Sequence, residues 1–304
     1  MRKESIMSEE IKIAIVGLDT SHATAFPKLM QDPTTPAEQK ISGLRVINCL
    51  RFETAFQNKE GLDKRQAYLE SIGVNVTENF DEAVAGCDAI MIEINDPSLH
   101  LEYFEKCAPL GKPIFLDKPF ADTVDSMCKI IELAKKYNVR FFTSSSLRFD
   151  IDFVEGLEKG LPVEKGMTWG PAGIPPKGPA VIWYGCHTFE MIQRIMGRGA
   201  ESVRGVKEGE SYLFRIKYAD GRTGIVELGS EFSYGALIRT KETEMQTIKV
   251  TGRVPFYYML MKQFVKFLQG EQPVELEDSV EVMALQEAAL KSIESGKAEP
   301  VFHL

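Results

Sequence analysis

The chain has 304 residues, 44% of them hydrophobic and 26% charged, a composition typical of a soluble globular protein with two domains. Its formal net charge of -8 argues against nucleic acid or an anionic membrane surface as the main partner. No apolar run is long enough to cross a bilayer, and the amino terminus lacks the apolar segment of a signal peptide. We therefore expect a cytoplasmic protein with no membrane partner, whose residues 1–10 are disordered.

The cysteines indicate neither a disulfide framework nor a zinc site built from cysteines, because they are odd in number, widely spaced and without a CxxC pair. They are Cys49, Cys87, Cys107, Cys128 and Cys186. Cys186 lies between a glycine and a histidine, yet a small buried side chain is a better interpretation than a thiol nucleophile. The sequence indicates neither disulfides nor a metal site.

The first predicted strand, residues 11–16, is followed by the turn GLDTSH and a predicted helix over residues 23–30. A dinucleotide-binding turn reads GxGxxG, and its three glycine positions fall here on Gly17, Asp19 and His22. Asp19 is a candidate N-cap whose carboxylate would occupy the amides that otherwise receive a pyrophosphate, at a cost of about 3 kcal/mol in repulsion. The turn therefore either binds phosphates, with hydroxyls of Thr20 and Ser21 as donors, or only caps the helix.

Two charged residues stand at or near the ends of predicted strands. Arg51 follows the strand 44–50, where an NAD site places an acidic residue, so it either pairs with the 2′-phosphate of NADP or is solvated. Glu93 lies in the apolar strand predicted over residues 88–94, where a buried carboxylate needs a partner unless it marks a solvent edge.

The stretch GKPIFLDKPF organises the first half of the chain. An apolar strand over residues 114–116 stops at Asp117-Lys118-Pro119, and Pro119 favours extended geometry for Lys118. Ligands bind at this carboxyl edge of open α/β sheets. Strands and helices alternate from residue 11 to residue 143, which predicts a doubly wound parallel sheet in a domain over residues 11–146.

The pattern changes after Asp150. Gly and Pro are frequent from residue 156 to residue 179, and a helix is predicted over residues 187–196. Alternating stretches at 211–218 and 222–229, joined by a turn, predict a large, mostly antiparallel open sheet with one face buried. Helices predicted over residues 256–268 and 279–295 close an α+β domain of residues 147–304 and are expected to pack back toward the first domain.

Together these motifs resemble the Gfo/Idh/MocA family of oxidoreductases over nearly the whole chain. Asp117-Lys118-Pro119 is similar to the EKP motif of that family, and the stretch WYGCH with Glu190 is similar to its second motif. His100 and the LRF stretch at 147–149 match further family positions. Hydride transfer from an alcohol needs a base and a group that stabilises the oxygen, and a histidine and a lysine suit these roles.

The resemblance implies a Rossmann domain that uses NAD or NADP, a small polar alcohol as substrate, and a homodimer or homotetramer formed through the second sheet. It implies that Lys118 and His187 are catalytic. The implied cofactor residues are Gly17, Asp19, Thr20, Ser21, Arg51, Asn95, His100, Asp117 and Pro119. The implied substrate residues are Glu93, Arg148, Trp183, Tyr184 and Glu190. Trp183 replaces an acidic residue of the family, so the substrate is either less sugar-like or contacted by stacking.

Two other functions stay open at this point. A ligand-binding or regulatory protein without redox turnover would explain the missing glycines. A tightly held cofactor used in non-redox chemistry, such as elimination, is the third alternative.

Overall fold

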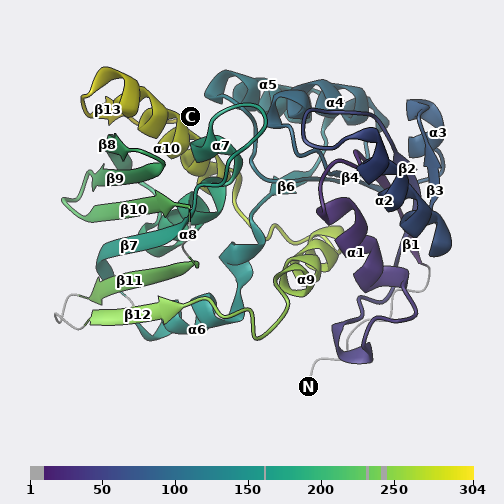
Figure 1. Ribbon diagram of the computed structural model, residues 1–304, viewed down its shortest axis with the longest axis horizontal. Coiled ribbons are helices and arrows are strands. Elements are labelled where there is room, and N and C mark those ends of the chain that lie inside the picture. The colour runs from purple at the N-terminus through teal and green to yellow at the C-terminus, as the bar shows by residue number, and fades with distance from the viewer. Residues whose placement is uncertain (1–9, 161, 231–232, 241–244) are drawn as a thin grey trace. The chain divides into compact units, whose positions relative to one another are not determined.

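The computed structural model describes residues 10–160, 162–230, 233–240 and 245–304 (Figure 1). Apart from Glu10, the segment predicted to be disordered lies outside the described residues. The chain forms two compact units that interleave in sequence. The first comprises the described residues up to Asp117 with Ile130–Phe141 and Met261–Glu271, and the second comprises Lys118–Lys129, Phe142–Leu260 and Gln272–Leu304.

The first unit contains a six-stranded sheet with the order β3-β2-β1-β4-β5-β6. The strands are β1 Ile11–Val16, β2 Leu44–Leu50, β3 Asn75–Thr77, β4 Ala89–Ile92, β5 Ile114–Leu116 and β6 Phe141–Thr143. Strand β1 pairs in parallel with both β2 and β4, β2 with β3, and β4 with β5. All residues of β4 and β5 are buried, as expected of parallel strands covered on both faces, and the predicted doubly wound sheet is confirmed.

Helices connect these strands in the alternating order that the sequence predicts. They are α1 His22–Gln31, α2 Lys59–Ser71, α3 Phe80–Val84, α4 His100–Cys107 and α5 Val124–Tyr137. Helix α9 Phe256–Leu268 comes much later in the chain and connects none of these strands. Short 3-10 turns lie at Ala37–Gln39, Pro97–Leu99, Ala108–Leu110 and Ser146–Phe149. The strand predicted over residues 88–94 is shorter than expected, because β4 ends at Ile92 and Glu93 begins the loop at its carboxyl end.

The second unit contains a seven-stranded sheet with the order β12-β11-β7-β10-β9-β8-β13. Its strands are β7 Val163–Pro171, β8 Ala200–Glu208, β9 Ser211–Tyr218, β10 Thr223–Gly229, β11 Gly235–Thr240, β12 Met245–Lys249 and β13 Glu299–Pro300. The central pair β7 and β10 is parallel and the other pairs are antiparallel, so the sheet is mostly antiparallel, as predicted.

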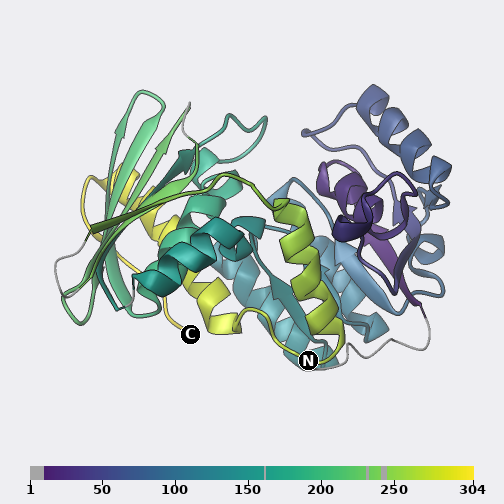
Figure 2. The same cartoon turned by 90° about the horizontal axis from the view of Figure 1, so that it is seen from below.

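Helices of the second unit lie along one face of its sheet (Figures 1 and 2). They are α6 Ile151–Lys159, α7 Ala180–Trp183, α8 Cys186–Met196 and α10 Leu276–Ser295. Neither α6 nor β7 was predicted, because the glycines of this stretch suggested a loop. In β7 they mark close packing instead: a Cβ on Gly166 would meet the Cγ2 of Ile195 on α8 at 2.8 Å.

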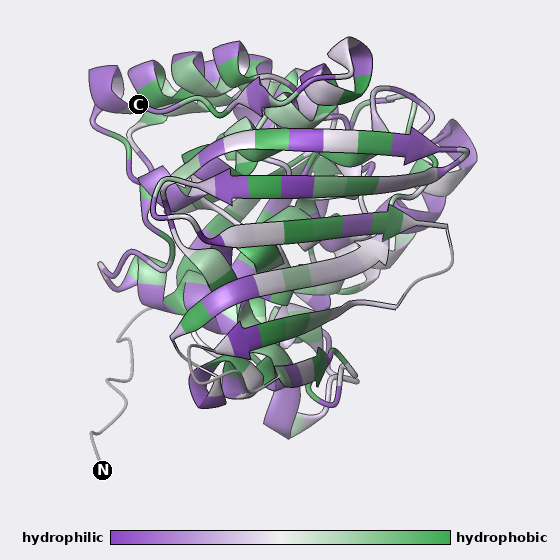
Figure 3. Ribbon diagram, turned by 90° about the vertical axis from the view of Figure 1, so that its left-hand side faces the viewer, coloured by the Kyte–Doolittle hydropathy of each residue, from purple (hydrophilic) through white to green (hydrophobic). Residues whose placement is uncertain are grey.

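The other face of this sheet carries no helix in Figure 3. Side chains alternate along each strand, so the residues next to Gly166 point away from α8. Met167 pairs with Ile225 on β10 and with Leu237 on β11, which places three apolar residues side by side on this face. Val206 and Leu213 form a second apolar pair, each 49% exposed.

Within the described part of the chain, no helix is both long and apolar enough to cross a membrane.

Candidate active site

The carboxyl ends of β1 and β4 are neighbours in the first unit, at the point where the strand order reverses direction. Ligands of open α/β sheets bind at this point. The backbone of Gly17 has a φ of 107°, and a Cβ added there would meet the carbonyl oxygen of Glu93 at 2.4 Å. Position 17 therefore requires glycine, as the first position of a dinucleotide-binding turn does.

Asp19 is buried, with 1% of its surface exposed. Its Oδ1 accepts a hydrogen bond from the backbone amide of Asn95 at 2.8 Å, and its Oδ2 accepts one from the Thr54 hydroxyl at 2.7 Å. Burial raises the pKa of this carboxyl, while the two hydrogen bonds and electrostatic interaction with His100 and Arg65 act in the opposite direction. Asp19 thus joins the loops that follow β1, β2 and β4.

The prediction that Asp19 caps the first helix is wrong, because Ser21 is the N-cap of α1 and Asp19 binds elsewhere. The Ser21 side chain makes no capping hydrogen bond, and the Thr20 hydroxyl accepts one from the backbone amide of His22 at 3.2 Å. The start of α1 is therefore not closed by a carboxylate.

Arg51 forms an ion pair with Asp63 of α2 and donates a further hydrogen bond to Gln66. The predicted alternative of a purely solvated arginine is therefore wrong. The guanidinium is held at the carboxyl end of β2 by its own neighbours, and contact with a 2′-phosphate stays a prediction.

His100 is fully buried, and its Nε2 lies 2.8 Å from the carbonyl oxygen of Ile94. This contact with Ile94 stabilises the loop after β4, and the backbone amide of Asn95 in the same loop donates a hydrogen bond to Asp19. Both residues thus shape the loop at the predicted cofactor edge.

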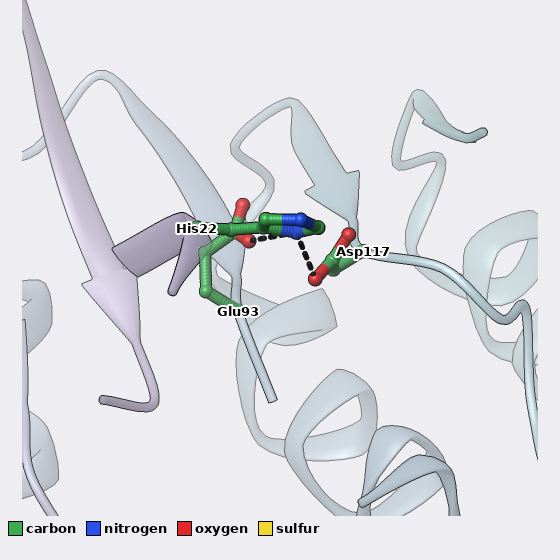
Figure 4. Close-up of side chains that lie close together, drawn as sticks. All are labelled: His22, Glu93 and Asp117. Atoms are coloured by element: carbon green, nitrogen blue, oxygen red, sulfur yellow. Dashed lines mark hydrogen bonds and ion pairs between the residues drawn. The ribbon is translucent and has the colours of Figure 1, made fainter. Parts of the chain in front are cut away.

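Three buried side chains meet at the same edge: His22 from α1, Glu93 after β4 and Asp117 after β5 (Figure 4). The Nδ1 of His22 lies 2.7 Å from an oxygen of Asp117 and 3.8 Å from an oxygen of Glu93. His22 occupies the third glycine position of the turn, and its ring stacks on Phe26 at 5.2 Å. The sequence analysis named Glu93 and Asp117 separately and did not predict this cluster.

The second unit begins at Lys118, which is joined to Pro119 by a cis peptide bond. Lys118 is 7% exposed, and its Nζ lies 5.9 Å from the centre of the Tyr184 ring. The same ring contacts the imidazole of His187 edge to face at 4.9 Å. Lys118, Tyr184 and His187 thus form one group, although nearly 70 residues separate the first two in the sequence.

The His187 ring is fixed on two sides. Its Nδ1 lies 2.6 Å from the Ser145 hydroxyl, which also accepts a hydrogen bond from the amide of Leu147 at 3.1 Å. The Tyr234 ring contacts the imidazole at 5.8 Å, and burial raises the pKa of the Tyr234 phenol far above its usual range, so that it stays neutral. A hydroxyl and two aromatic rings therefore surround this histidine.

Glu190 lies one helical turn after His187 and forms a buried ion pair with Arg148. An Nη1 of Arg148 donates to Glu190 at 3.0 Å and to Gln193 at 2.8 Å, and Glu190 also accepts from the amide of Ser145 at 3.2 Å. Burial raises the pKa of Glu190, while the Arg148 charge lowers it. The pair supports the loop that carries Ser145, and its polar atoms are engaged by protein groups.

Trp183 lies beside Tyr184, with ring centres 5.2 Å apart. The predicted substrate residues of the second unit thus form two sets: Trp183 and Tyr184 beside His187, and Arg148 with Glu190 beneath Ser145. Glu93 belongs to the first unit. Ser145 was missed because a serine triplet after a strand carries no distinctive pattern, and Thr54 and Tyr234 were missed because nothing in the sequence connects them to their partners.

Residues 11–145 match a family model described as an oxidoreductase family with an NAD-binding Rossmann fold, GFO_IDH_MocA. The myo-inositol 2-dehydrogenase of Thermotoga maritima is 23% identical, and the match covers 95% of this chain and 98% of that protein. An uncharacterised oxidoreductase of Streptococcus pneumoniae is 22% identical over 204 residues, and there the match spans 55% of the relative's length.

Solved structures share the fold over the whole chain. GenD2 from gentamicin A biosynthesis, solved in complex with NAD, has a TM-score of 0.81 at 13% identity. The match covers 98% of this chain and 98% of GenD2. The scyllo-inositol dehydrogenase of Lactobacillus casei, solved with NAD(H) and scyllo-inositol, has a TM-score of 0.74 at 17% identity. The match covers 96% of this chain and 99% of that one.

Proposed function

Because the chain belongs, through residues 11–145, to the Gfo/Idh/MocA family of oxidoreductases with an NAD-binding Rossmann fold, we propose that it transfers a hydride between NAD(P) and a secondary hydroxyl of a small polyol or sugar derivative. The observation that carries this proposal is the group formed by Lys118, Tyr184 and His187. Its lysine directly follows Asp117, which terminates the central strand β5 of the nucleotide-binding fold.

The first unit fits the cofactor in two respects. Gly17 makes the close turn that brings the start of α1 to the carboxyl ends of the strands, and the carboxylate of Asp19 is turned to Asn95 and Thr54 instead of the helix amides. The start of a helix favours a phosphate, and Thr20 and Ser21 add hydroxyl groups there. NAD(P)+ bound at this edge would supply the hydride acceptor.

In the second unit, we assign the proton transfer to Nε2 of His187. In the tautomer that we assign, the Nδ1–H of the ring donates to the Ser145 hydroxyl, and Nε2 is the atom that accepts a proton. As the carbon loses its hydride, the hydroxyl proton passes to Nε2 and a carbonyl forms. The ammonium of Lys118 stabilises the negative charge that develops on the oxygen during this step.

A cyclic polyol is the substrate class that we favour. Two of the relatives are named for dehydrogenases of inositol, a ring whose hydroxyls are polar and whose C–H faces are apolar. Tyr184 supplies an aromatic ring beside His187, and the Trp183 ring lies next to that of Tyr184. Such rings stack on the apolar face of a sugar-like molecule.

The test begins with calorimetric titration of the cofactor-stripped protein with NADH and with NADPH, followed by oxidation assays on inositol isomers and simple sugars. We expect micromolar binding of one cofactor and turnover of a cyclic polyol. Lys118→Ala should lower kcat about 100- to 1000-fold with cofactor affinity unchanged, because the oxygen loses its main electrostatic partner. Lys64→Ala, a change on the exposed face of α2, serves as the control.

Two results would contradict the proposal. Cofactor binding without turnover of any alcohol would favour the ligand-binding alternative, and full activity of the Lys118 variant would remove this lysine from the mechanism.

We further propose that two copies of the chain associate through the uncovered face of the second sheet. Met167, Ile225 and Leu237 lie side by side there, and Val206 and Leu213 form a second apolar pair on the same face. Exposed apolar surface of this kind marks an interaction site. Light scattering after size-exclusion chromatography should give at least a dimer, and Leu213→Glu should shift it toward the monomer. A monomeric parent protein would overturn this assignment.

A further inference from the structure

We propose that His22, Glu93 and Asp117 bind one divalent transition-metal ion. The three side chains come from three different elements of the first unit, and one ligand atom of each lies within 4.8 Å of the others (Figure 4). The proposal concerns the first unit alone and does not depend on the reaction assigned to Lys118 and His187.

The distances are close to those that a metal requires. Ligand atoms at about 2.1 Å from a tetrahedral ion are about 3.4 Å apart. The Nδ1 of His22 lies 2.7 Å from Asp117 and 3.8 Å from Glu93, one value below and one above that separation. An ion could therefore enter the cluster with side-chain shifts of less than about 1 Å, and no backbone rearrangement is needed.

The backbone already holds the ligands in place. The amide of Glu93 donates to Val16 at 2.8 Å and the amide of Asp117 donates to Ile92 at 2.9 Å, so both carboxylates leave the ends of paired central strands. His22 is the first residue of α1, and stacking on Phe26 restricts its ring. Such preorganisation reduces the ordering that a bound ion would otherwise have to impose.

Burial and charge favour a cation at this position. Glu93 is 0%, Asp117 1% and His22 6% exposed. Two carboxylates held this close and away from water repel each other strongly, since their interaction is poorly screened. A divalent ion neutralises both carboxylates while leaving the imidazole neutral, as a metal ligand must be.

The donor set indicates the class of ion. One imidazole nitrogen with two carboxylate oxygens suits Zn²⁺, Mn²⁺, Fe²⁺ or Co²⁺, whereas Mg²⁺ and Ca²⁺ prefer oxygen alone. The expectation of no metal site rested on the cysteines, which have no part in this cluster. An ion there would join α1 to the ends of β4 and β5, directly before Lys118 in the chain.

The test is calorimetric titration of tag-free, chelator-treated protein with ZnCl₂ and with MnCl₂, in the absence of cofactor and substrate. We expect one equivalent to bind with micromolar or tighter affinity. His22→Ala and Glu93→Gln should each weaken binding at least about 100-fold, since a lost ligand costs more than a lost outer-shell partner. His303→Ala, which removes an exposed histidine at the carboxyl end, should bind as the parent does.

Absorption of the Co²⁺-loaded protein provides a second measurement, because the visible bands of this ion depend on its ligands. They should be present in the parent and change in Asp117→Asn, with circular dichroism confirming that the variant is folded. Absence of binding at millimolar metal, or equal affinity of the Glu93 variant, would overturn the proposal and leave an ordinary hydrogen-bonded histidine and aspartate.

Discussion

Two buried histidines have opposite surroundings in the two units. His22 in the first unit has its Nδ1 between two carboxylates, from Asp117 and Glu93. His187 in the second unit has its Nδ1 on the hydroxyl of Ser145, with aromatic rings on other sides. Carboxylates favour a positive charge at the histidine, whether from a proton or from a metal ion, whereas a hydroxyl fixes the ring with little charge of its own.

The different surroundings suit the two histidines to different roles, proton transfer and ion binding. A histidine that must gain and lose a proton during turnover is better placed beside neutral groups, because a nearby carboxylate would hold the proton. A histidine that must hold a cation is better placed among carboxylates. The surroundings of His187 therefore suit proton transfer, and those of His22 suit ion binding.

The largest expected effect follows from removing the proton acceptor. His187→Asn keeps a polar side chain at the start of α8, but it cannot accept the hydroxyl proton. We expect kcat to fall about 100- to 10,000-fold, the usual contribution of a general base, with cofactor affinity unchanged. Steady-state kinetics and calorimetry would measure both. A loss of less than about 10-fold would assign the base elsewhere.

The next largest effect is expected at the buried ion pair between Arg148 and Glu190. Arg148→Ala would leave Glu190 buried without its cation, which typically lowers the free energy of unfolding by about 3–5 kcal/mol. Urea denaturation would measure the loss. The matched double variant Arg148→Met with Glu190→Gln removes both charges and should recover more than half of it. If the double variant were no more stable than Arg148→Ala, the loss would come from packing instead of charge.

A smaller effect is expected from the hydroxyl that fixes the imidazole. Ser145→Ala removes the hydrogen-bond partner of His187 Nδ1 but leaves the base and the lysine in place. We expect kcat to fall about 10-fold with KM nearly constant, because the hydroxyl acts on the tautomer and not on substrate binding. Ser145→Thr should restore most of the rate. A rise in KM alone would show that Ser145 contacts the substrate.

The smallest effect lies in the first unit, in how stability depends on pH. Burial raises the folded pKa of Asp19 above its ordinary value of 3.8, so its stabilising contribution is complete below that value and is lost as pH rises through the folded pKa. Asp19→Asn retains an acceptor for the Asn95 amide and cannot ionise. We expect it to gain stability relative to the parent between about pH 4 and pH 7.

Urea denaturation of the Asp19 variant and the parent at several pH values would measure this gain. Arg65 and His100 are the charged or titratable groups that act on Asp19, so both must stay unchanged. A stability difference that does not vary with pH would mean that Asp19 is ionised in the folded protein throughout this range.

Local patterns predicted much of the first unit correctly. The strands at 11–16, 44–50 and 114–116 have the predicted bounds, because buried parallel strands form apolar runs that proline, glycine and charge interrupt. By contrast, β7 was missed, because its glycines are explained only by the helix that packs against them.

The sequence by itself determined the alternation of strands and helices, which follows from local order along the chain. It also gave Lys118 and His187 as candidates, through motifs that resemble those of the family. Only the tertiary structure decided which groups these and the other polar residues contact. Asp19 joins loops 35 and 76 residues away, His187 meets a serine 42 residues earlier, and His22 meets an aspartate 95 residues later. The residues around either partner form no pattern that indicates the other. The hydrogen bond forms only because the fold brings together the strands and helices that carry the two side chains.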